Sequence, residues 1–367
     1  MKKNQVLLTA KMRILKKVTF LSAVVAMLLV VAAPPAWAQQ AAVDQTHTAA
    51  IADTKPVTWD NWVRAETDKM LKSYVDLGGF GKFFNIRTPT PIDAQKVMRM
   101  NRDTLYSFGV FDLTSPVTIT KPDTGNRFQS MMVLNQDEYI PIPEVYSPGE
   151  YTLTQQNVGT RYVFVGVRTF ANSEDPADIK KVNVIQDQIK VEQASAGKFE
   201  IPNWDQKSQD RLRDAINVIA ATMKDASKCF GTKKEVDPVA FLLGAAMGWG
   251  GNPAKDATYL NFYPEKNDGE TPYTLNVKDV PVDAFWSISL YNSKGFFQEN
   301  KYNAYSINNI TGVKNKDGSM TIHFGGDPKQ SNYLPIVDGW NYIVRLYRPR
   351  KEILNGKWKF PSAHPVK

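Results

Sequence analysis

The spacing of hydrophobic residues changes its period near residue 104. Upstream, apolar residues recur at helical spacing in WDNWVRAETDKMLKSYVDL, between Thr58 as a candidate N-cap and Gly78-Gly79 as a C-cap. The pattern therefore predicts a helix here, followed by a loop over 82–91 and a short helix over 91–98.

From Thr104 onward the period is two, the spacing of a β-strand with two different faces. Tyr106 and Phe108 share one face of this strand, whereas Leu105 and Phe111 belong to the other. The turn signals PDTG and SPG that follow are typical of an antiparallel β-sandwich or barrel. Similar alternating runs predict strands at 116–120, 127–135, 150–154 and 161–170.

A helical segment interrupts the strands. Residues 175–193 and 208–230 both read as amphipathic helices, and a short buried helix follows, with Asp237 as its cap and Pro238 at its first position. Lys316-Asp317-Gly318 is a hairpin turn signal in the strand-rich part that comes next, because glycine tolerates a positive φ. The clearest strands there are predicted at 285–292, 303–313, 319–326 and 340–349.

The first 38 residues have the pattern of a secretory signal peptide. Six lysines and arginines precede the apolar run FLSAVVAMLLVVAA, and Ala36-Trp37-Ala38 is a cleavage site. The apolar run is shorter than the roughly 20 residues of a membrane span. Cleavage after Ala38 would leave a periplasmic or secreted protein with no membrane span. It would also reduce the formal net charge of +8 to +2, so the charge does not argue for a nucleic-acid partner.

The fold class expected from these elements is mainly β with α. Two β-sandwich lobes are predicted, with an N-terminal helix and a helical segment between the lobes. The predicted divisions are a signal peptide over 1–38, a flexible leader over 39–57, an N-terminal β-rich domain over 58–172, a helical connecting segment over 173–251 and a C-terminal β-sandwich over 252–367.

Several kinds of chemistry are not supported by the residue types present. The chain has three histidines (His47, His323 and His364) and one cysteine, Cys229. These are too few and too scattered for a usual histidine or thiolate metal site. His323 alternates with apolar neighbours and is expected to point away from their face. We predict no metal and no cofactor, although a Ca²⁺ held by carboxylates stays open.

The segment NRDTLYS (101–107) places a charge pair where an alternating strand begins. Arg102 and Asp103 can pin a structural corner, with Asn101 shaping the turn. Alternatively, they lie at the mouth of the sandwich, where ligands enter. Arg168, on a strand face with aromatic residues, must be paired, stacked or in contact with a ligand, and the same holds for Arg345.

Asp137-Glu138 follows the strand at 127–135 and offers paired carboxyl groups. A hydrolase acting on a carbohydrate or ester would use Asp103 or Glu138 as its acid or base. Adjacent acids at the end of a strand are also common in solvated loops, so both interpretations stay open.

The chain resembles a two-domain family catalogued as domains of unknown function 1254 and 1214. The first resemblance rests on NRDTLYSFGVFDL, RYVFVGVRTF and VNVIQDQIKVE, and the second on DAFWSISLYNSKGFF, NAYSIN, KDGSMTIHFGGD, SNYLP and YIVRLYRPRKEILNGKWKFP. It spans roughly residues 60–362. It implies an exported or envelope-associated bacterial protein with jelly-roll-like sandwich lobes. The motif residues that correspond are Asn101, Arg102, Asp103, Thr104, Tyr106, Arg168, Gln186 and Asp187 in the first domain, and Trp286, Tyr291, Leu334, Pro335, Arg345, Tyr347 and Trp358 in the second.

Three functions compete at this stage. The first is binding of a small molecule or glycan near the junction of the lobes, with Arg102, Asp103 and Arg168 orienting the ligand and Tyr106 and Tyr139 stacking on it. The second is the hydrolase that uses Asp103 or Glu138. The third is a structural role in the envelope as a homo-oligomer.

Overall fold

The computed structural model describes residues 54–95 and 98–366. The N-terminal half forms a four-stranded antiparallel sheet, in the order β1-β2-β6-β4, that packs on a three-stranded sheet, in the order β5-β3-β7. We call this pair the N-terminal sandwich. Its strands are β1 (Phe83–Asn85), β2 (Thr104–Asp112), β3 (Val117–Lys121), β4 (Gln129–Asn135), β5 (Gly149–Leu153), β6 (Tyr162–Phe170) and β7 (Lys190–Gln193).

The core of the N-terminal sandwich comes from alternate residues of its strands. Phe111 of β2 and Val165 of β6 are buried against Ile119 of β3. The other face of β2 carries Phe108, which packs in a separate cluster that includes Leu71 of the first helix. The predicted alternation along β2 is therefore confirmed, and it gives this sheet two covered faces.

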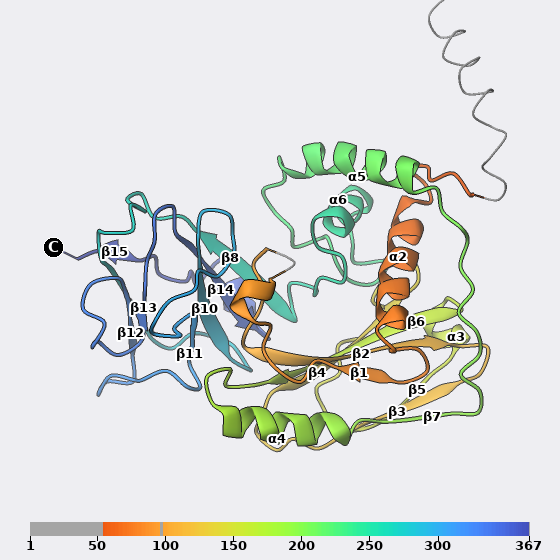
Figure 1. The fold of residues 1–367 in the computed structure, drawn as a ribbon, viewed down its shortest axis with the longest axis horizontal. Helices are drawn as coiled ribbons and strands as arrows, with labels where there is room; N and C mark the ends of the chain where they lie inside the picture. Colours follow the sequence, from red (N-terminus) through yellow and green to blue (C-terminus); the bar gives the residue numbers. More distant parts are fainter. Residues whose placement is uncertain (1–53, 96–97, 367) are drawn as a thin grey trace, which may run out of the picture. The chain divides into compact units, whose positions relative to one another are not determined.

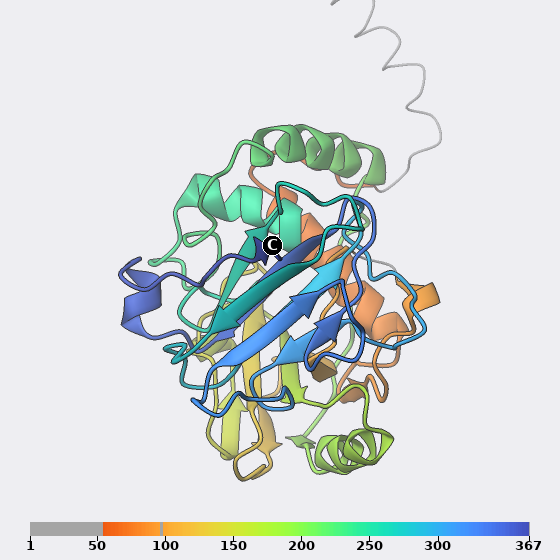
Figure 2. The ribbon, with the colours of Figure 1, turned by 90° about the vertical axis from the view of Figure 1, so that its left-hand side faces the viewer.

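The second half of the chain forms the C-terminal sandwich, whose two four-stranded sheets have the orders β11-β10-β14-β8 and β13-β12-β9-β15 (Figure 2). Ile288 and Val344 from one sheet pack against Leu275 and Ile322 from the other. The strands are β8 (Ala257–Phe262), β9 (Tyr273–Val277), β10 (Trp286–Tyr291), β11 (Ser306–Asn308), β12 (Met320–Phe324), β13 (Tyr333–Leu334), β14 (Asn341–Tyr347) and β15 (His364–Pro365).

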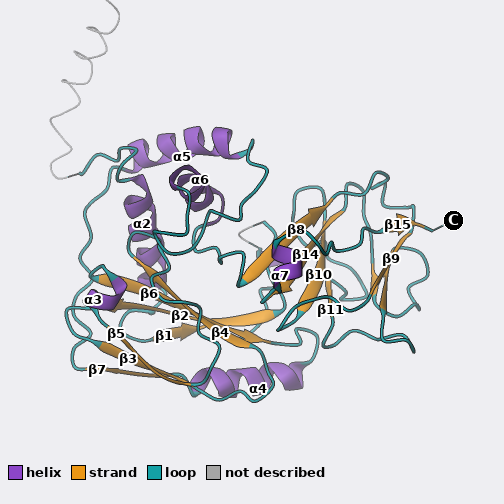
Figure 3. Cartoon of the chain, turned by 180° about the vertical axis from the view of Figure 1, so that it is seen from behind, coloured by secondary structure: helices purple, strands orange, loops and turns teal. Residues whose placement is uncertain are grey.

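Helices cover the N-terminal sandwich on two sides (Figures 1 and 3). The helices α2, α5 and α6 share a cluster in which Trp62, Ile216 and Leu243 are buried. On the opposite face of the four-stranded sheet from α2, the helix α4 packs its Val182 against Leu105 of β2. The helices are α2 (Trp62–Asp76), η1 (Ile92–Ala94), α3 (Gln155–Val158), α4 (Pro176–Asp187), α5 (Gln206–Ala220), α6 (Pro238–Gly248) and α7 (Lys351–Leu354).

The fold class predicted from the sequence, mainly β with α, is confirmed, whereas its jelly-roll-like character stays a prediction. The cap of α6 is also confirmed, since the Asp237 side chain accepts from the backbone N–H groups of Val239 and Ala240. Gly318 closes its turn with a φ of 84°, but the predicted hairpin is wrong, because the flanking strands β11 and β12 belong to different sheets. His323 lies on the face of β12 opposite the buried Ile322, as expected.

Several predicted boundaries are wrong. The helix α2 begins at Trp62 after Asn61, because the Thr58 side chain bonds to Asp60 instead of capping the helix. Residues 190–193 form the strand β7 rather than the end of a helix, because they complete the ladder along β3. The helix α5 ends at Ala220, and the strand expected at 303–313 is reduced to β11.

The predicted signal peptide lies outside the described residues, and so does the leader up to residue 53. Of residues 54–57, Lys55 forms a parallel bridge with Trp204, and Val57 is buried. The predicted domain boundaries stay predictions. Within the described ranges, no helix is both long enough and apolar enough to cross a bilayer.

Candidate functional site

The segment Asn101-Arg102-Asp103 connects the two sandwiches. The Asn101 side chain donates to the hydroxyl of Tyr347 on β14 at 2.7 Å and to that of Tyr106 on β2 at 3.2 Å. Its carbonyl oxygen accepts from the backbone N–H of Asp103 at 2.7 Å, which closes a turn. The turn predicted from the sequence is present, and it also carries a contact to the other sandwich.

Asp103 is buried within this junction. Its carboxylate accepts from the hydroxyls of Ser287 at 2.5 Å and Ser306 at 3.0 Å, which lie on β10 and β11. Burial raises the pKa of Asp103, against the opposing effects of the Arg345 charge and the two serines. Asp103, a residue of the N-terminal half of the chain, is thus the hydrogen-bond acceptor for two serines of the C-terminal sandwich.

Arg345, on β14 of the C-terminal sandwich, also stabilises the contact between the two sandwiches. Its guanidinium donates to Ser289 at 2.8 Å, to the Tyr291 hydroxyl at 2.8 Å and to the backbone carbonyl of Arg99 at 2.9 Å. Ser289 and Ser306 are 3.1 Å apart, so a chain of hydroxyls links Arg345 to Asp103. Two buried charges of opposite sign are therefore connected without direct contact.

The side chain of Arg102 does not join the hydrogen bonds around Asp103 and Arg345. It donates to the backbone carbonyl of Thr90 at 3.0 Å and lies over the Tyr305 ring, 5.0 Å from its centroid. Together with Asp103 and Glu174 it lines a small cavity of about 210 Å³. Among the ion pairs of the described residues, Arg102 and Asp103 do not pair with each other.

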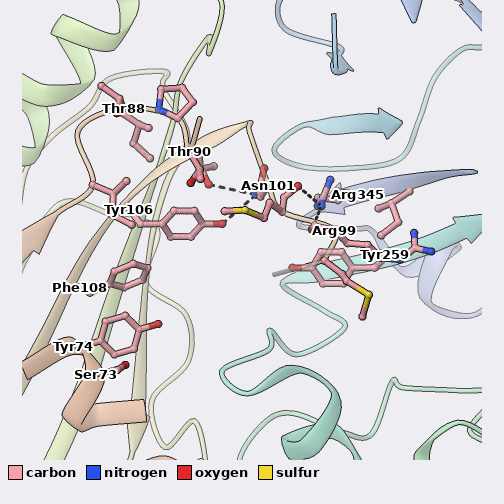
Figure 4. A pocket seen from close by; sticks show the side chains of 17 residues that line it. Ser73, Tyr74, Thr88, Thr90, Arg99, Asn101, Tyr106, Phe108, Tyr259 and Arg345 are labelled. Carbon is pink, nitrogen blue, oxygen red and sulfur yellow. Dashed lines mark hydrogen bonds between the residues drawn. The ribbon is translucent and has the colours of Figure 1, made fainter. Parts of the chain in front are cut away.

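A larger cavity, of about 700 Å³, lies on another side of Asn101 (Figure 4). We call it the junction cavity, because its walls come from both sandwiches and from the segment that connects them. Its lining residues are Ser73, Tyr74, Ile86, Thr88, Pro89, Thr90, Met98, Arg99, Met100, Asn101, Thr104, Leu105, Tyr106, Phe108, Tyr259, Ile343 and Arg345.

One side of the junction cavity is an aromatic wall made of Tyr74, Tyr106 and Phe108 (Figure 4). The Tyr106 and Phe108 rings stack with centroids 5.3 Å apart, and the Tyr74 ring lies 4.9 Å from Phe108. Gly166 is the cross-strand partner of Phe108, and a Cβ there would lie 3.0 Å from the Phe164 ring, so glycine leaves room for Phe164, whose ring centroid lies 5.6 Å from that of Phe108. Burial raises the pKa of Tyr74 to about 12, which keeps its hydroxyl protonated.

Tyr259 of β8 and Arg99 lie across the cavity from this wall (Figure 4). Tyr259 is 44% exposed, and because it lines the cavity, this surface is available to a ligand. Arg99 donates to the hydroxyl of Tyr263 at 2.7 Å. Its guanidinium also lies 5.8 Å from the ring of Tyr291. The cavity thus combines aromatic surface with one cationic end.

Arg168 lies behind the aromatic wall. Its guanidinium is 5.8 Å from the Tyr106 ring and bonds to the side chain of Asn252, which in turn donates to Glu144 at 3.1 Å. Tyr106 and Arg168 are cross-strand partners in the ladder of β2 and β6. Of the predicted ligand-binding residues, Tyr106 therefore lines the junction cavity and Arg168 supports it.

The other predicted site residues lie apart from this cavity. Tyr139 stacks on Phe241, with centroids 4.6 Å apart. Glu138 is buried with a positive φ of 66°, and its carboxyl accepts from the backbone N–H of Gly250 at 3.2 Å. Burial raises the pKa of Glu138 to about 8. The structure does not bring Glu138 or Tyr139 together with Tyr106, and contact of either with a ligand stays a prediction.

Sequence reasoning missed Arg99, Tyr74 and Tyr259. Tyr74 lies in the segment predicted as a helix, and Tyr259 lies on β8, which is not among the strands predicted from the sequence. Only the pairing of β8 with β14 identifies Tyr259 as a candidate site residue, because there it is the cross-strand partner of Arg345. Within residues 54–95 and 98–366, no group of three or more histidine, cysteine, aspartate or glutamate side chains is placed to hold a metal ion.

Comparisons with known proteins agree with this architecture. A family model described as "Protein of unknown function (DUF1254)" matches residues 80–193, and one described as "Protein of unknown function (DUF1214)" matches residues 261–351. The two matches contain the Asn101-Arg102-Asp103 segment and Arg345, respectively. No curated protein matches the sequence.

Two solved structures resemble the chain. The VPA0106 protein from Vibrio parahaemolyticus shares 17% sequence identity with it, at a TM-score of 0.64, over 84% of this chain and 98% of that one. This likeness concerns the fold. An uncharacterized protein from Burkholderia cenocepacia shares 14% identity, at a TM-score of 0.45, over 83% of this chain and 87% of that one.

Proposed function

The chain belongs to the two-domain family that combines DUF1254 with DUF1214, and we propose that it binds a small, largely apolar organic molecule in the junction cavity. The observation that carries this proposal is the cavity itself. Its volume of about 700 Å³ falls within the range of small-molecule sites, about 300–1,000 Å³. Such sites are lined mainly by apolar and aromatic side chains with a few polar groups, which matches this cavity.

The lining favours an apolar ligand over a glycan. A sugar requires many unoccupied donors and acceptors around its hydroxyls, because each buried polar group must be satisfied. Here Asn101 and Arg345 already use their polar atoms within the protein. The aromatic wall, by contrast, offers open ring surface to an apolar body.

The cavity also favours binding over hydrolysis. None of its 17 lining residues is an aspartate, glutamate, histidine, lysine or cysteine. General acid–base catalysis requires one of these groups, or a tyrosine, within hydrogen-bond reach of the reacting atoms. Of the tyrosines in the lining, burial raises the pKa of Tyr74 and Tyr259 further from neutral pH, which makes them poorly suited to this role. Asp103 and Glu138, the acids that the hydrolase hypothesis would use, are not part of the lining.

Export is a second part of the proposal. It is supported by the basic and apolar N-terminus with the Ala36-Trp37-Ala38 motif. Expression of the full chain in a Gram-negative bacterium should give a periplasmic product that begins at Gln39, as read by intact mass. Retention of residues 1–38 in a cytoplasmic product would contradict it.

The binding proposal is tested by obstructing the mouth of the cavity. Ser73 lies on α2, is exposed and lines the cavity, so Ser73→Trp should fill the entrance at little cost to folding. Lys72→Trp is the matched control, because Lys72 is exposed on the same helix but is not part of the lining.

The readout is ligand-observed NMR with a library of small aryl and alkyl compounds. We expect compounds that bind the wild type and Lys72→Trp but lose binding in Ser73→Trp. Binding that persists unchanged in Ser73→Trp, or no binding to the wild type, would refute the proposal.

A further inference from the structure

Three arginines lie in or around the junction cavity, and they differ in how their charge is balanced. Arg345 is linked to the buried Asp103 through two serine hydroxyls. Arg168 is linked to the buried Glu144 through Asn252. Among the described residues, none of the three forms a direct ion pair, and the Arg99 guanidinium also lacks a hydrogen-bonded link to a carboxylate, because its one side-chain hydrogen bond goes to Tyr263. The cavity therefore has one positive charge that the described protein does not neutralise.

Arg99 is held in place by its backbone. Its φ is 54°, in the left-handed region that a residue with a side chain rarely adopts. Its N–H donates to the carbonyl of Gly295 at 2.7 Å, and its own carbonyl accepts from Arg345 at 2.9 Å. Contacts from the C-terminal half thus fix an unfavourable conformation that presents Arg99 to the cavity.

The Arg99 guanidinium has more N–H donors than the surrounding protein has acceptors for them. Its Nη2 donates to the hydroxyl of Tyr263, while its Nη1 is buried and has no hydrogen-bond partner among the described residues. The remaining surroundings are the rings of Tyr263 and Tyr291, with centroids 5.7 and 5.8 Å away. A guanidinium has five N–H donors in a planar fork, which a carboxylate complements best.

We infer that the ligand of the junction cavity is an amphipathic organic monocarboxylate. Its carboxylate binds Arg99, and its aromatic or alkyl body lies against the wall of Tyr74, Tyr106 and Phe108 across the cavity (Figure 4). A single negative charge follows from the single unbalanced arginine. This inference rests on the proposed function, since it names the ligand class of the same cavity.

The test compares two probes of nearly the same shape, 4-phenylbutyrate and the uncharged 4-phenylbutyramide, by isothermal titration calorimetry. The wild type should bind the carboxylate at least about tenfold more tightly than the amide, the effect of one charge-assisted hydrogen bond. Arg99→Gln should lose this preference. Arg211→Gln, which removes the same charge from an exposed position of α5, should retain it.

The outcomes separate this inference from the proposed function. Equal affinity of the wild type for both probes would overturn the inference and leave the binding cavity standing. A preference for the carboxylate that survives in Arg99→Gln would likewise overturn it, because another group would then hold the charge. Failure of both probes to bind the wild type would count against the cavity as a binding site and against its ligand class together.

Discussion

The connection between the two sandwiches is expected to depend on hydrogen bonding by Asp103 rather than on its charge. In Asp103→Ala, the fully buried Ser287 hydroxyl loses its acceptor, which costs about 1–3 kcal/mol, and Ser306 loses a hydrogen bond that contributes about 1 kcal/mol. We therefore expect the free energy of unfolding to fall by about 2–4 kcal/mol.

Asp103→Asn separates the two contributions. The amide keeps the shape, can accept from one serine and can donate to the oxygen of the other. Burial raises the pKa of Asp103 despite its hydrogen bonds and the Arg345 charge, so ionising this carboxyl costs more in the folded state than in the unfolded chain. A neutral side chain of the same size avoids that cost. We expect Asp103→Asn to lose less than about 1.5 kcal/mol.

The assay is urea unfolding followed by tryptophan fluorescence and by circular dichroism, at pH 7. Asp76→Asn is the control, because it removes an exposed i,i+4 ion pair with Lys72 that contributes at most about 0.5 kcal/mol. Comparable losses for Asp103→Asn and Asp103→Ala would mean that charge dominates at this junction. A loss below about 1 kcal/mol for Asp103→Ala would refute the reasoning altogether. Since Asp103→Asn should remain folded, it also tests the hydrolase hypothesis on a panel of esters and glycosides.

Three further predictions concern pH and the two faces of β2. The folded-state pKa of Glu138, about 8, is above its ordinary value, so its contribution to stability is complete below about pH 4.5 and is lost as the pH rises through 8. Glu138→Gln should flatten the decline in stability between pH 5 and 9, measured by urea unfolding; an unchanged slope would contradict the assignment. Phe111→Ala should cost about 3–5 kcal/mol in thermal unfolding, because Phe111 is fully buried in the sandwich core, and a cost below about 1.5 kcal/mol would contradict this. Phe108→Ala should cost less than Phe111→Ala but weaken ligand binding by tenfold or more, as followed by NMR titration; unchanged binding would remove Phe108 from the site.

The sequence predicted the parts of the fold that local patterns determine. The alternation in β2 correctly separates Phe111, in the core, from Tyr106 and Phe108, on the face of the cavity. The prediction of a helix over residues 190–193 is wrong, because a short run of alternating residues fits both helix and strand periods, and the ladder with β3 makes these residues a strand. Strands of two or three residues, such as β13, are likewise defined by their partners rather than by their own pattern.

The junction cavity was harder to predict, because it forms between segments far apart in the chain. Arg102 and Asp103 were singled out as a pair, yet one lies against Tyr305 and the other against Ser287. These partners are about two hundred residues away in the sequence, and no local pattern identifies them. Arg99 carries no sequence signal of its own, since its importance comes from a backbone conformation and from the absence of a carboxylate partner in the described structure.

The measurement that tests the central claim most directly is native mass spectrometry of the chain from Gln39 onward, isolated from a bacterial periplasm and compared with its denatured mass. The account predicts a non-covalent adduct of small-molecule mass on the wild type and on Lys72→Trp, lost on denaturation and absent from Ser73→Trp. The same spectra give the number of subunits and so test the homo-oligomer hypothesis. A bare subunit mass for all three proteins, or an adduct that Ser73→Trp retains, would contradict binding in the junction cavity.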